Sequence, residues 1–267
     1  MNKRYVLSGF VWILFLPTLA FAARIAVVVD DLGNQWTMGR RVVQLPGPVA
    51  VAILPGTPYA RRLGRLAHVH GKEVLAHLPM ESADDERLGP YALRLEMSQA
   101  AFTQQVTSAL AGIPYVSGVN NHMGSMLTRH PGHMAWLMQT LQRHKGWYFL
   151  DSRTTDKTVA ERVAEEYSIP ALRRNVFLDD VREPAAVAAQ FRRLLRFARR
   201  HGSALAIGHP YPVTLDTLER LLPELTDSDV VLVSPRGLLH RQEQVVQGSA
   251  AGHASAIGAS AALSLRR

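Results

Sequence analysis

The chain has 267 residues, a formal net charge of +8 and no cysteine. This length fits one large α/β domain or two small ones, and a hydrophobic content of 47% excludes a largely disordered chain. Without cysteine there are no disulfides, Cys-ligated zinc, iron–sulfur clusters or Cys nucleophile, so any metal must be held by His and carboxylate side chains.

The N-terminus is predicted to be an export signal. Lys3 and Arg4 precede an apolar run over residues 6–16, and the small-residue pattern Ala-Phe-Ala ends at Ala22. This order is typical of a cleavable signal peptide, and the run is shorter than the about 20 apolar residues of a membrane span. We expect residues 1–22 to be removed and the folded part to work in a bacterial periplasm with no stable membrane span. An uncleaved N-terminal anchor is the alternative.

Apolar runs and helical segments then alternate along the chain. Strands buried on both faces are predicted at residues 24–30, 49–54, 73–76, 115–119, 147–150, 171–178, 203–207 and 230–233. Helices are predicted at residues 35–44, 58–70, 98–111, 131–145, a short segment from 158, 184–201 and 214–225. Thr57 with Pro58 should begin the second helix, and Thr158 with Glu161 should form a capping box. This alternation favours a (β/α) barrel over the alternative, an open doubly wound sheet.

The C-terminal segment and the basic residues carry weaker information about function than the strand and helix pattern. From Gln242 onward the chain is rich in Ala, Ser and Gly and lacks aromatic residues, so we predict one domain over residues 23–240 and a disordered tail over 241–267. Arginines cluster on predicted helices without any nucleic-acid-binding pattern, and we expect no nucleic-acid partner. We interpret them as solvated helix faces, with attraction to an anionic envelope polymer or membrane as the alternative.

Polar side chains gather at or just past the carboxyl ends of the predicted strands. They are Asp30, Asp31, His77, Asn121, His122, Asp151, Asp179 and His209. Active sites of α/β barrels form at this face. Three such histidines after three different strands, with paired acids, are hard to assign to packing. Asp179 and Asp180 are expected instead to form a turn before the helix at Pro184.

These residue types suit metal-dependent hydrolysis. Two His and one carboxylate with an open position for water make a hydrolytic zinc site, at which the pKa of the water falls to about 7. A second carboxylate can accept the proton of the water, and a separate His can protonate the leaving group.

Five segments resemble the motifs of the divergent polysaccharide deacetylases, a branch of the NodB-type deacetylases in the bacterial envelope. They are VVVDDLG (27–33), AHLPME (76–81), GVNNHMGS (118–125), FLDSRTT (149–155) and IGHPYP (207–212). The first is weak alone, whereas the last three in this order are specific. The main NodB branch carries both metal histidines in a His-Ser/Thr-x-x-His-Pro motif, which this chain lacks. His130 and His133 have the wrong order for it and are expected to mark a helix start.

The resemblance implies a distorted (β/α) barrel of about seven to eight strands that holds a divalent metal, usually Zn²⁺. It implies that Asp31, His77 and His122 bind the metal. Asp30 is then the general base, and His209 is the candidate general acid.

The resemblance also implies a reaction, hydrolysis of the amide of an N-acetyl sugar in an envelope glycan. Asp151 would orient His209 or bind the metal region, and we assign Asn121 and Ser152 to substrate binding. Two alternatives stay open. The protein could be a non-catalytic envelope protein that kept the barrel and binds glycan or a protein partner. It could also be a glycoside hydrolase that uses two carboxylates, Asp30 and Asp151, roughly 5 to 9.5 Å apart.

Overall fold

A computed structural model describes residues 22–83 and 87–239 of the chain. The predicted signal peptide, apart from Ala22, and the predicted C-terminal tail lie outside the described residues. None of the helices within those two ranges combines the length and the apolar character that a bilayer crossing requires.

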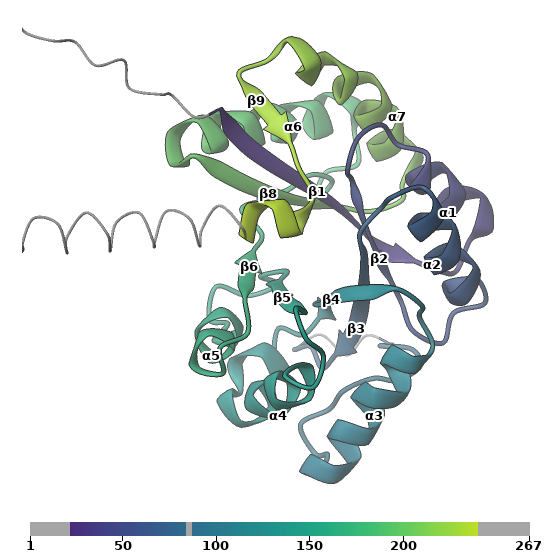
Figure 1. The fold of residues 1–267 in the computed structure, drawn as a ribbon, viewed down its shortest axis with the longest axis vertical. Helices are drawn as coiled ribbons and strands as arrows, with labels where there is room; N and C mark the ends of the chain where they lie inside the picture. The colour runs from purple at the N-terminus through teal and green to yellow at the C-terminus, as the bar shows by residue number, and fades with distance from the viewer. Residues whose placement is uncertain (1–21, 84–86, 240–267) are drawn as a thin grey trace, which may run out of the picture.

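The described residues form one curled sheet in which every strand pairing is parallel (Figure 1). The strands are β1 Ala23–Leu32, β2 Ala50–Ile53, β3 Val74–Met80, β4 Val116–Met123, β5 Tyr148–Asp151, β6 Ala171–Arg173, β7 Val176–Phe177, β8 Ser203–Gly208 and β9 Val230–Leu232. Their order in the sheet is β6-β5-β4-β3-β2-β1-β8-β7, and β9 pairs with β1 as a branch. Each predicted strand is present, and the predicted distorted barrel is confirmed.

One short stretch joins the two edges of the sheet. The strand predicted at residues 171–178 is split, and its first half, β6, pairs with β5 while its second half, β7, pairs with β8. Between them the Arg174 amide donates to the Asp151 carbonyl at 2.9 Å, and the Asn175 amide donates to the Leu205 carbonyl at 2.8 Å. The stretch therefore leaves one edge and pairs with the other, which distorts the barrel where it closes.

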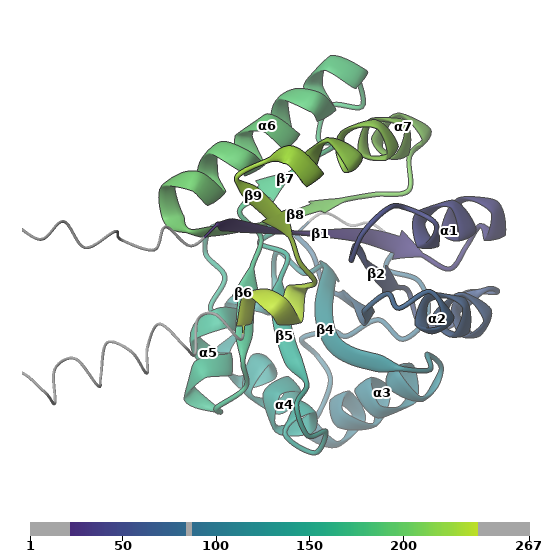
Figure 2. The ribbon, with the colours of Figure 1, turned by 45° about the horizontal axis from the view of Figure 1, so that its top comes forward.

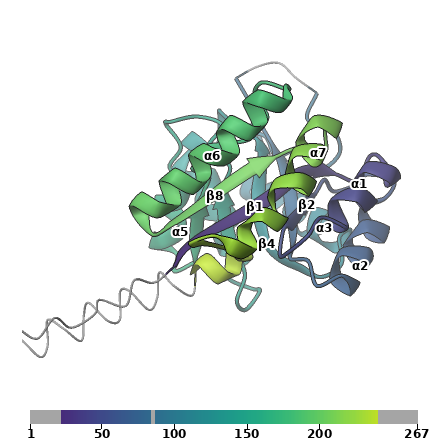
Figure 3. The same cartoon turned by 90° about the horizontal axis from the view of Figure 1, so that it is seen from above.

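Helices surround the sheet on its outside (Figures 1 and 2). They are α1 Trp36–Val43, α2 Ala60–Val69, α3 Gln99–Ala111, α4 Pro131–Leu141, α5 Ala160–Glu166, α6 Pro184–His201 and α7 Pro212–Leu221. Helix α6 runs alongside β8, and α7 lies between α6 and α1 (Figure 3). Two predicted helix starts are wrong. The Thr57 hydroxyl donates to the Leu54 carbonyl at 2.7 Å and α2 begins only at Ala60, whereas the N-cap of α5 is Val159, with no side-chain cap.

Side chains alternate between two cores because successive residues of a strand face opposite sides of the sheet. Residues such as Val27 and Val29 of β1 pack outward against the helices. Ala26 and Val28 point into the barrel, where they join a smaller apolar cluster with residues of the other strands. That inner cluster fills the lower part of the barrel, so the polar residues farther along the strands lie above an apolar floor.

Candidate metal centre and catalytic cleft

The site continues the inward-facing rows of the strands toward their carboxyl ends. Two residues beyond the inner apolar positions of β1, β3, β5 and β8 come Asp30, His77, Ser152 and His209, and Asn120 of β4 joins them through hydrogen bonds to His77 and Asp30. Strands β3 and β4 extend to Met80 and Met123, so His77 and His122 lie within these strands. The sequence alone predicts both histidines past the strand ends. The predicted carboxyl-end location of the site holds, whereas the predicted ends of these strands are too early.

Consecutive residues Asp30 and Asp31 reach the same site because β1 carries a bulge. Val29 pairs with Val51 and Leu32 with Ile53, so β1 has one residue more than β2 over this stretch. Asp31 takes the left-handed conformation with φ 58°, which is uncommon for a residue other than glycine. In a regular strand the two carboxylates would face opposite sides. The bulge instead brings Asp30 Oδ2 to 3.6 Å and Asp31 Oδ1 to 3.2 Å from His77 Nε2.

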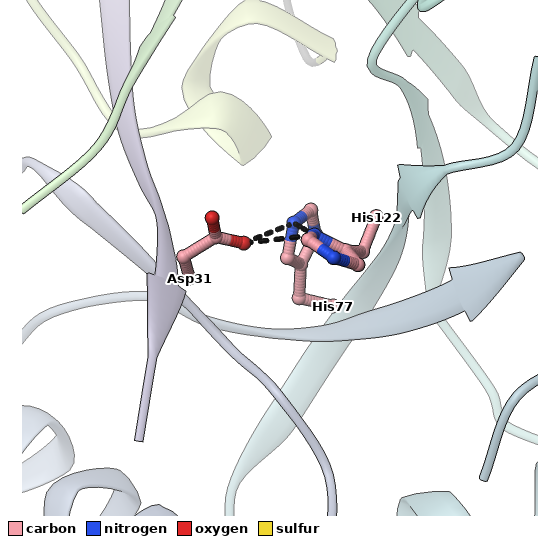
Figure 4. A group of neighbouring side chains, drawn as sticks. All are labelled: Asp31, His77 and His122. Atoms are coloured by element: carbon pink, nitrogen blue, oxygen red, sulfur yellow. Dashed lines mark hydrogen bonds and ion pairs between the residues drawn. The ribbon is translucent and has the colours of Figure 1, made fainter. Parts of the chain in front are cut away.

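Asp31, His77 and His122 converge on one point (Figure 4). Asp31 Oδ1 lies 2.9 Å from His122 Nδ1 and 3.2 Å from His77 Nε2, and the two ring nitrogens are 3.3 Å apart. Ligands about 2.0–2.1 Å from a tetrahedral ion are roughly 3.3 Å from one another, so the spacing fits such an ion. Asp31 Oδ1 is buried, and among the residues that the structure describes no donor is aligned for a hydrogen bond to it. A cation would satisfy this oxygen.

Asn120, which the sequence analysis did not select, holds His77 in the orientation that a metal ligand needs. Its Oδ1 accepts from His77 Nδ1 at 2.9 Å, and its Nδ2 donates to Asp30 Oδ1 at 2.9 Å. An amide oxygen only accepts, so Nδ1 of His77 carries the proton and Nε2 of the neutral ring presents a lone pair to the site. Asn120 lies two residues before His122 on β4, so both side chains face the inside of the barrel. This period-two spacing is the sequence signal that could have identified Asn120.

The close charges shift the protonation of these groups. Burial raises the pKa of the Asp30 carboxyl, and the His77 imidazole only partly opposes this effect. Burial alone would also raise the pKa of Asp31, but the His122 and His77 imidazoles hold it well below its usual range. Burial alone would lower the pKa of His77, but the carboxylates of Asp30 and Asp31 outweigh it and raise that pKa. The Asp31 carboxylate therefore stays ionised beside the Asp30 carboxyl, which binds a proton more readily.

Asp179 orients His209, which corrects the expectation for Asp151. His209 Nδ1 donates to Asp179 Oδ1 at 2.9 Å, and the Thr214 hydroxyl donates to Asp179 Oδ2 at 2.8 Å. Asp179 is therefore a site residue and not only part of a turn. The proton on Nδ1 leaves Nε2 facing the metal cluster, 3.8 Å from Asp31 Oδ2. Burial would lower the pKa of His209, but the hydrogen bond to Asp179 and the nearby Asp30 outweigh it and raise that pKa.

Asp151 and Asn121 are engaged away from the metal cluster. Asp151 accepts from the Arg153 amide and from the Thr158 hydroxyl, each at 2.8 Å, and burial raises the pKa of its carboxyl. The glycoside hydrolase alternative required Asp151 as a free second carboxylate, and these two hydrogen bonds argue against that role. Asn121 donates to the Met123 carbonyl at 2.7 Å and accepts from the Ser152 amide at 2.8 Å, so it ties β4 to the loop after β5.

A cleft of about 570 Å³ opens above these residues. Its lining includes Asp30, His77, His122, Asn121, Ser152 and His209. The structure thus places six of the eight predicted site residues along one cleft, with Asp31 directly beside it and Asp151 outside its lining. Substrate contacts by Asn121 and Ser152 stay predictions.

The sequence is similar to proteins of one family. Residues 27–239 match the profile of a family described as divergent polysaccharide deacetylase. An uncharacterized protein of Escherichia coli K12, YibQ, is 39% identical over 241 residues, which cover 90% of this chain and 75% of YibQ.

Solved structures share the fold at lower identity. An uncharacterized protein of Agrobacterium tumefaciens, ATU2773, superposes with a TM-score of 0.78 at 22% identity, covering 83% of this chain and 91% of that one. The peptidoglycan deacetylase PdaC of Bacillus subtilis gives a TM-score of 0.51 at 13% identity, covering 85% and 95%. A mutant of BA3943, described as a CE4 family pseudoenzyme with restored enzymatic activity, gives 0.50 at 13% identity, covering 82% and 68%. At these identities the likeness supports the fold alone.

Proposed function

The chain belongs to the divergent polysaccharide deacetylase family, and from this membership and the geometry of the site we propose that it is a metal-dependent carbohydrate N-deacetylase. The observation that carries the proposal is the convergence of Asp31, His77 and His122, with the buried Asp30 carboxyl and the Asp179–His209 pair beside them. The substrate class is an N-acetylated glycan of the bacterial envelope.

Asp31, His77 and His122 would hold the metal, and a donor set of two imidazoles and one carboxylate favours Zn²⁺. Such an ion supplies Lewis-acid polarisation of a carbonyl and lowers the pKa of water toward neutrality. The chain prepares the donor set itself, because Asn120 fixes the tautomer of His77 and the bulge in β1 aims Asp31. Such supporting contacts are typical of metal sites.

Asp30 and His209 have complementary roles in proton transfer. The raised pKa of the Asp30 carboxyl makes it a better proton acceptor for the attacking water than an exposed aspartate. His209, whose pKa is raised beside Asp179, keeps a proton on Nε2 to give to the departing nitrogen. Water adds to the acetyl carbon and the carbon–nitrogen bond breaks, so the products are acetate and a free amine on the sugar.

A non-catalytic envelope protein is the second candidate. BA3943, which shares the fold, is described as a pseudoenzyme, and a shared fold does not establish catalysis. Such a protein would keep the barrel and the metal and bind glycan without turning it over.

We also propose that the chain is exported to the periplasm. The support is the order of a charged segment, an apolar run and a small-residue cleavage pattern over residues 1–22. Fractionation of cells that express the full chain tests this, because cytoplasmic recovery of an uncleaved protein would contradict it.

The decisive experiment measures amine release from N-acetylated oligosaccharides by the purified chain, with and without a chelator and after zinc is restored. We expect release that the chelator abolishes and zinc restores. Release that persists in protein shown to be metal-free would refute metal dependence. A chain that retains about one zinc and binds glycan but releases no amine would support the non-catalytic alternative.

A further inference from the structure

Three arginines line the same cleft as the metal cluster. They are Arg153 in the loop after β5, Arg174 between β6 and β7, and Arg193 on α6. The three side chains come from the segments that close the barrel, whereas the metal cluster comes from β1, β3 and β4. Positive charge is therefore gathered in a part of the cleft that the proposed chemistry does not use.

These arginines lack the carboxylate partners that others in the protein have. Arg41, Arg162 and Arg199 each form an ion pair with an acidic side chain. Over the described ranges, the guanidinium groups of Arg153 and Arg193 have neither a hydrogen bond nor an ion pair.

Arg174 is held in place by neutral groups. Its Nε donates to the Ser152 carbonyl at 2.6 Å, and its Nη2 donates to the Arg153 carbonyl at 2.7 Å. Its guanidinium also lies 4.9 Å from the centre of the Phe177 ring. The side chain is thus fixed at the cleft, and within the described part of the chain no carboxylate forms an ion pair with it.

The acidic groups of the cleft do not cancel this charge. Asp30 and Asp180 are the acidic residues in the lining, and the Asp30 carboxyl is buried and already accepts a hydrogen bond from Asn120 Nδ2 at 2.9 Å. Burial lowers the pKa of Arg174, and the Arg153 guanidinium lowers it further, while the carboxylates of Asp151, Asp30 and Asp180 oppose both effects. The Asp151 carboxylate interacts electrostatically with both Arg153 and Arg174 but lies outside the cleft lining, so an anion bound in the cleft would add to the compensation of these two neighbouring cations.

Helix α6, which runs alongside β8 (Figure 3), carries further positive charge. Its eighteen residues contain five arginines and no acidic residue. Arg193 lines the cleft, and exposed arginines follow along the same helix at Arg196 and Arg200. A polymeric ligand that extends from the cleft along α6 would meet further positive charge.

We propose that the cleft binds an anionic glycan, in which a sugar next to the N-acetylated unit carries a carboxylate or phosphate group that Arg153, Arg174 and Arg193 recognise. Guanidinium groups suit this role because their planar donor arrays match both anions. This inference rests on the proposed function, because that function makes a glycan the ligand. A membrane surface fits less well, because Arg174 is partly buried in the cleft where a flat surface does not reach.

Binding tests this inference without relying on turnover. Calorimetry on the purified zinc-loaded chain, in an Asp30→Asn background that prevents hydrolysis, compares three tetrasaccharides of N-acetylglucosamine type. Chitotetraose is neutral, a hyaluronan tetrasaccharide carries carboxylates, and 6-O-phosphorylated chitotetraose carries phosphate. We expect at least one anionic ligand to bind about tenfold more tightly than chitotetraose at roughly 0.05 M salt, with the preference shrinking at about 0.5 M. The two anionic arms distinguish carboxylate from phosphate.

Variants assign the preference to the arginines. Arg153→Gln and Arg193→Gln should each weaken the anionic ligand about five- to tenfold and chitotetraose less than about twofold, since a charged contact is lost in only one case. Arg143→Gln is the matched control, because Arg143 is exposed, follows α4 and lies outside the cleft lining. A comparable loss in that control would contradict the assignment.

Three outcomes separate the possibilities. Equal affinity for neutral and anionic tetrasaccharides would overturn the inference. Binding to anionic phospholipid vesicles that Arg196→Gln weakens and Arg153→Gln leaves intact, without a glycan preference, would overturn it in favour of a membrane surface. A glycan preference that depends on Arg153 in a chain that releases no amine would support this inference and refute only the proposed hydrolysis.

Discussion

Replacing Asn120 with leucine should weaken metal binding although Asn120 is not itself a metal ligand. Asn120 is completely buried and contacts His77 Nδ1 and Asp30 Oδ1, each at 2.9 Å, with a longer hydrogen bond of 3.3 Å to the Ser152 hydroxyl. Leucine has a similar volume but no polar atoms, so Asn120→Leu removes the two short contacts together with the longer one and lets the His77 ring rotate or change tautomer. The variant therefore tests whether this positioning residue prepares the metal site.

The expected magnitudes follow from these two contacts. A buried polar group that loses its partner costs about 1–3 kcal/mol, so two such groups should lower the free energy of unfolding by roughly 2–6 kcal/mol. Loss of a group that orients a metal ligand typically weakens metal affinity about 10–100-fold. Asn120→Asp keeps an acceptor for His77 Nδ1 and should restore part of the affinity, because carboxylates commonly hold ligating imidazoles, whereas its second oxygen replaces the donor to Asp30 Oδ1 and must share a proton with that carboxyl.

The assay is zinc affinity by competition with a chromophoric chelator, with urea unfolding of the metal-free chain measured in parallel. Asn121→Leu is the matched control. Asn121 is also buried and makes two hydrogen bonds, but its partners are the backbone of Met123 and Ser152. We expect this control to lose a similar amount of stability and to retain zinc affinity within about threefold, because no ligand is released.

A folded Asn120→Leu variant that binds zinc as tightly as the unmodified chain would contradict a positioning role for Asn120. Equal losses of zinc affinity in the two leucine variants would also contradict it, because the effect would then follow from general destabilisation of β4. A stable Asn120→Leu variant that loses affinity, rescued by Asn120→Asp, is the result expected of a group that orients His77.

Further variants test the remaining roles at the site. Asp31→Ala and His122→Ala should each reduce bound zinc from about one per chain to near zero by elemental analysis, and unchanged zinc in both would contradict the ligand assignment. Asp30→Asn should retain zinc and lose amine release by about a hundredfold or more, so a rate equal to that of the unmodified chain would exclude Asp30 as the base. Asp179→Asn should slow turnover about tenfold or more by releasing His209, whereas Asp151→Asn should cost about 1–3 kcal/mol of stability and leave the turnover of folded protein nearly unchanged. Equal kinetic effects in the last two variants would restore the original role of Asp151.

The sequence predicted the order of elements well because the strands are apolar on both faces and stand out from the helices between them. It ended β3 and β4 too early for a physical reason. Inside the barrel the inward rows become polar at His77 and Asn120, which interrupts the apolar run while the backbone pairing continues to Met80 and Met123. The polar residues that form the site are therefore the ones that made the strand ends hard to predict from the apolar pattern.

The partner of His209 depended on pairing that no local pattern reveals. Asp179 follows the short strand β7, and its contact with His209 requires β7 to pair with β8 after β6 has paired with β5. Asp151 ends the longer and clearer strand β5, which made it the more evident candidate. The bulge that aims Asp31 is a similar case, because the sequence shows two adjacent aspartates and not the extra residue in the register.

Curvature of the sheet is what turns separate strands into one site. Asp31 is on β1 and His122 is on β4, three strands away in the order of the sheet. Neighbouring strands lie about 4.7–4.9 Å apart, so in a flat sheet these backbones would be separated by roughly 14 Å. Their side-chain atoms nevertheless approach to 2.9 Å, while His209 on the other side of β1 approaches Asp31 to 3.8 Å. Closure of the barrel and formation of the metal cluster are therefore one structural event, and a cation held by β1, β3 and β4 would stabilise the curled sheet over a flatter one.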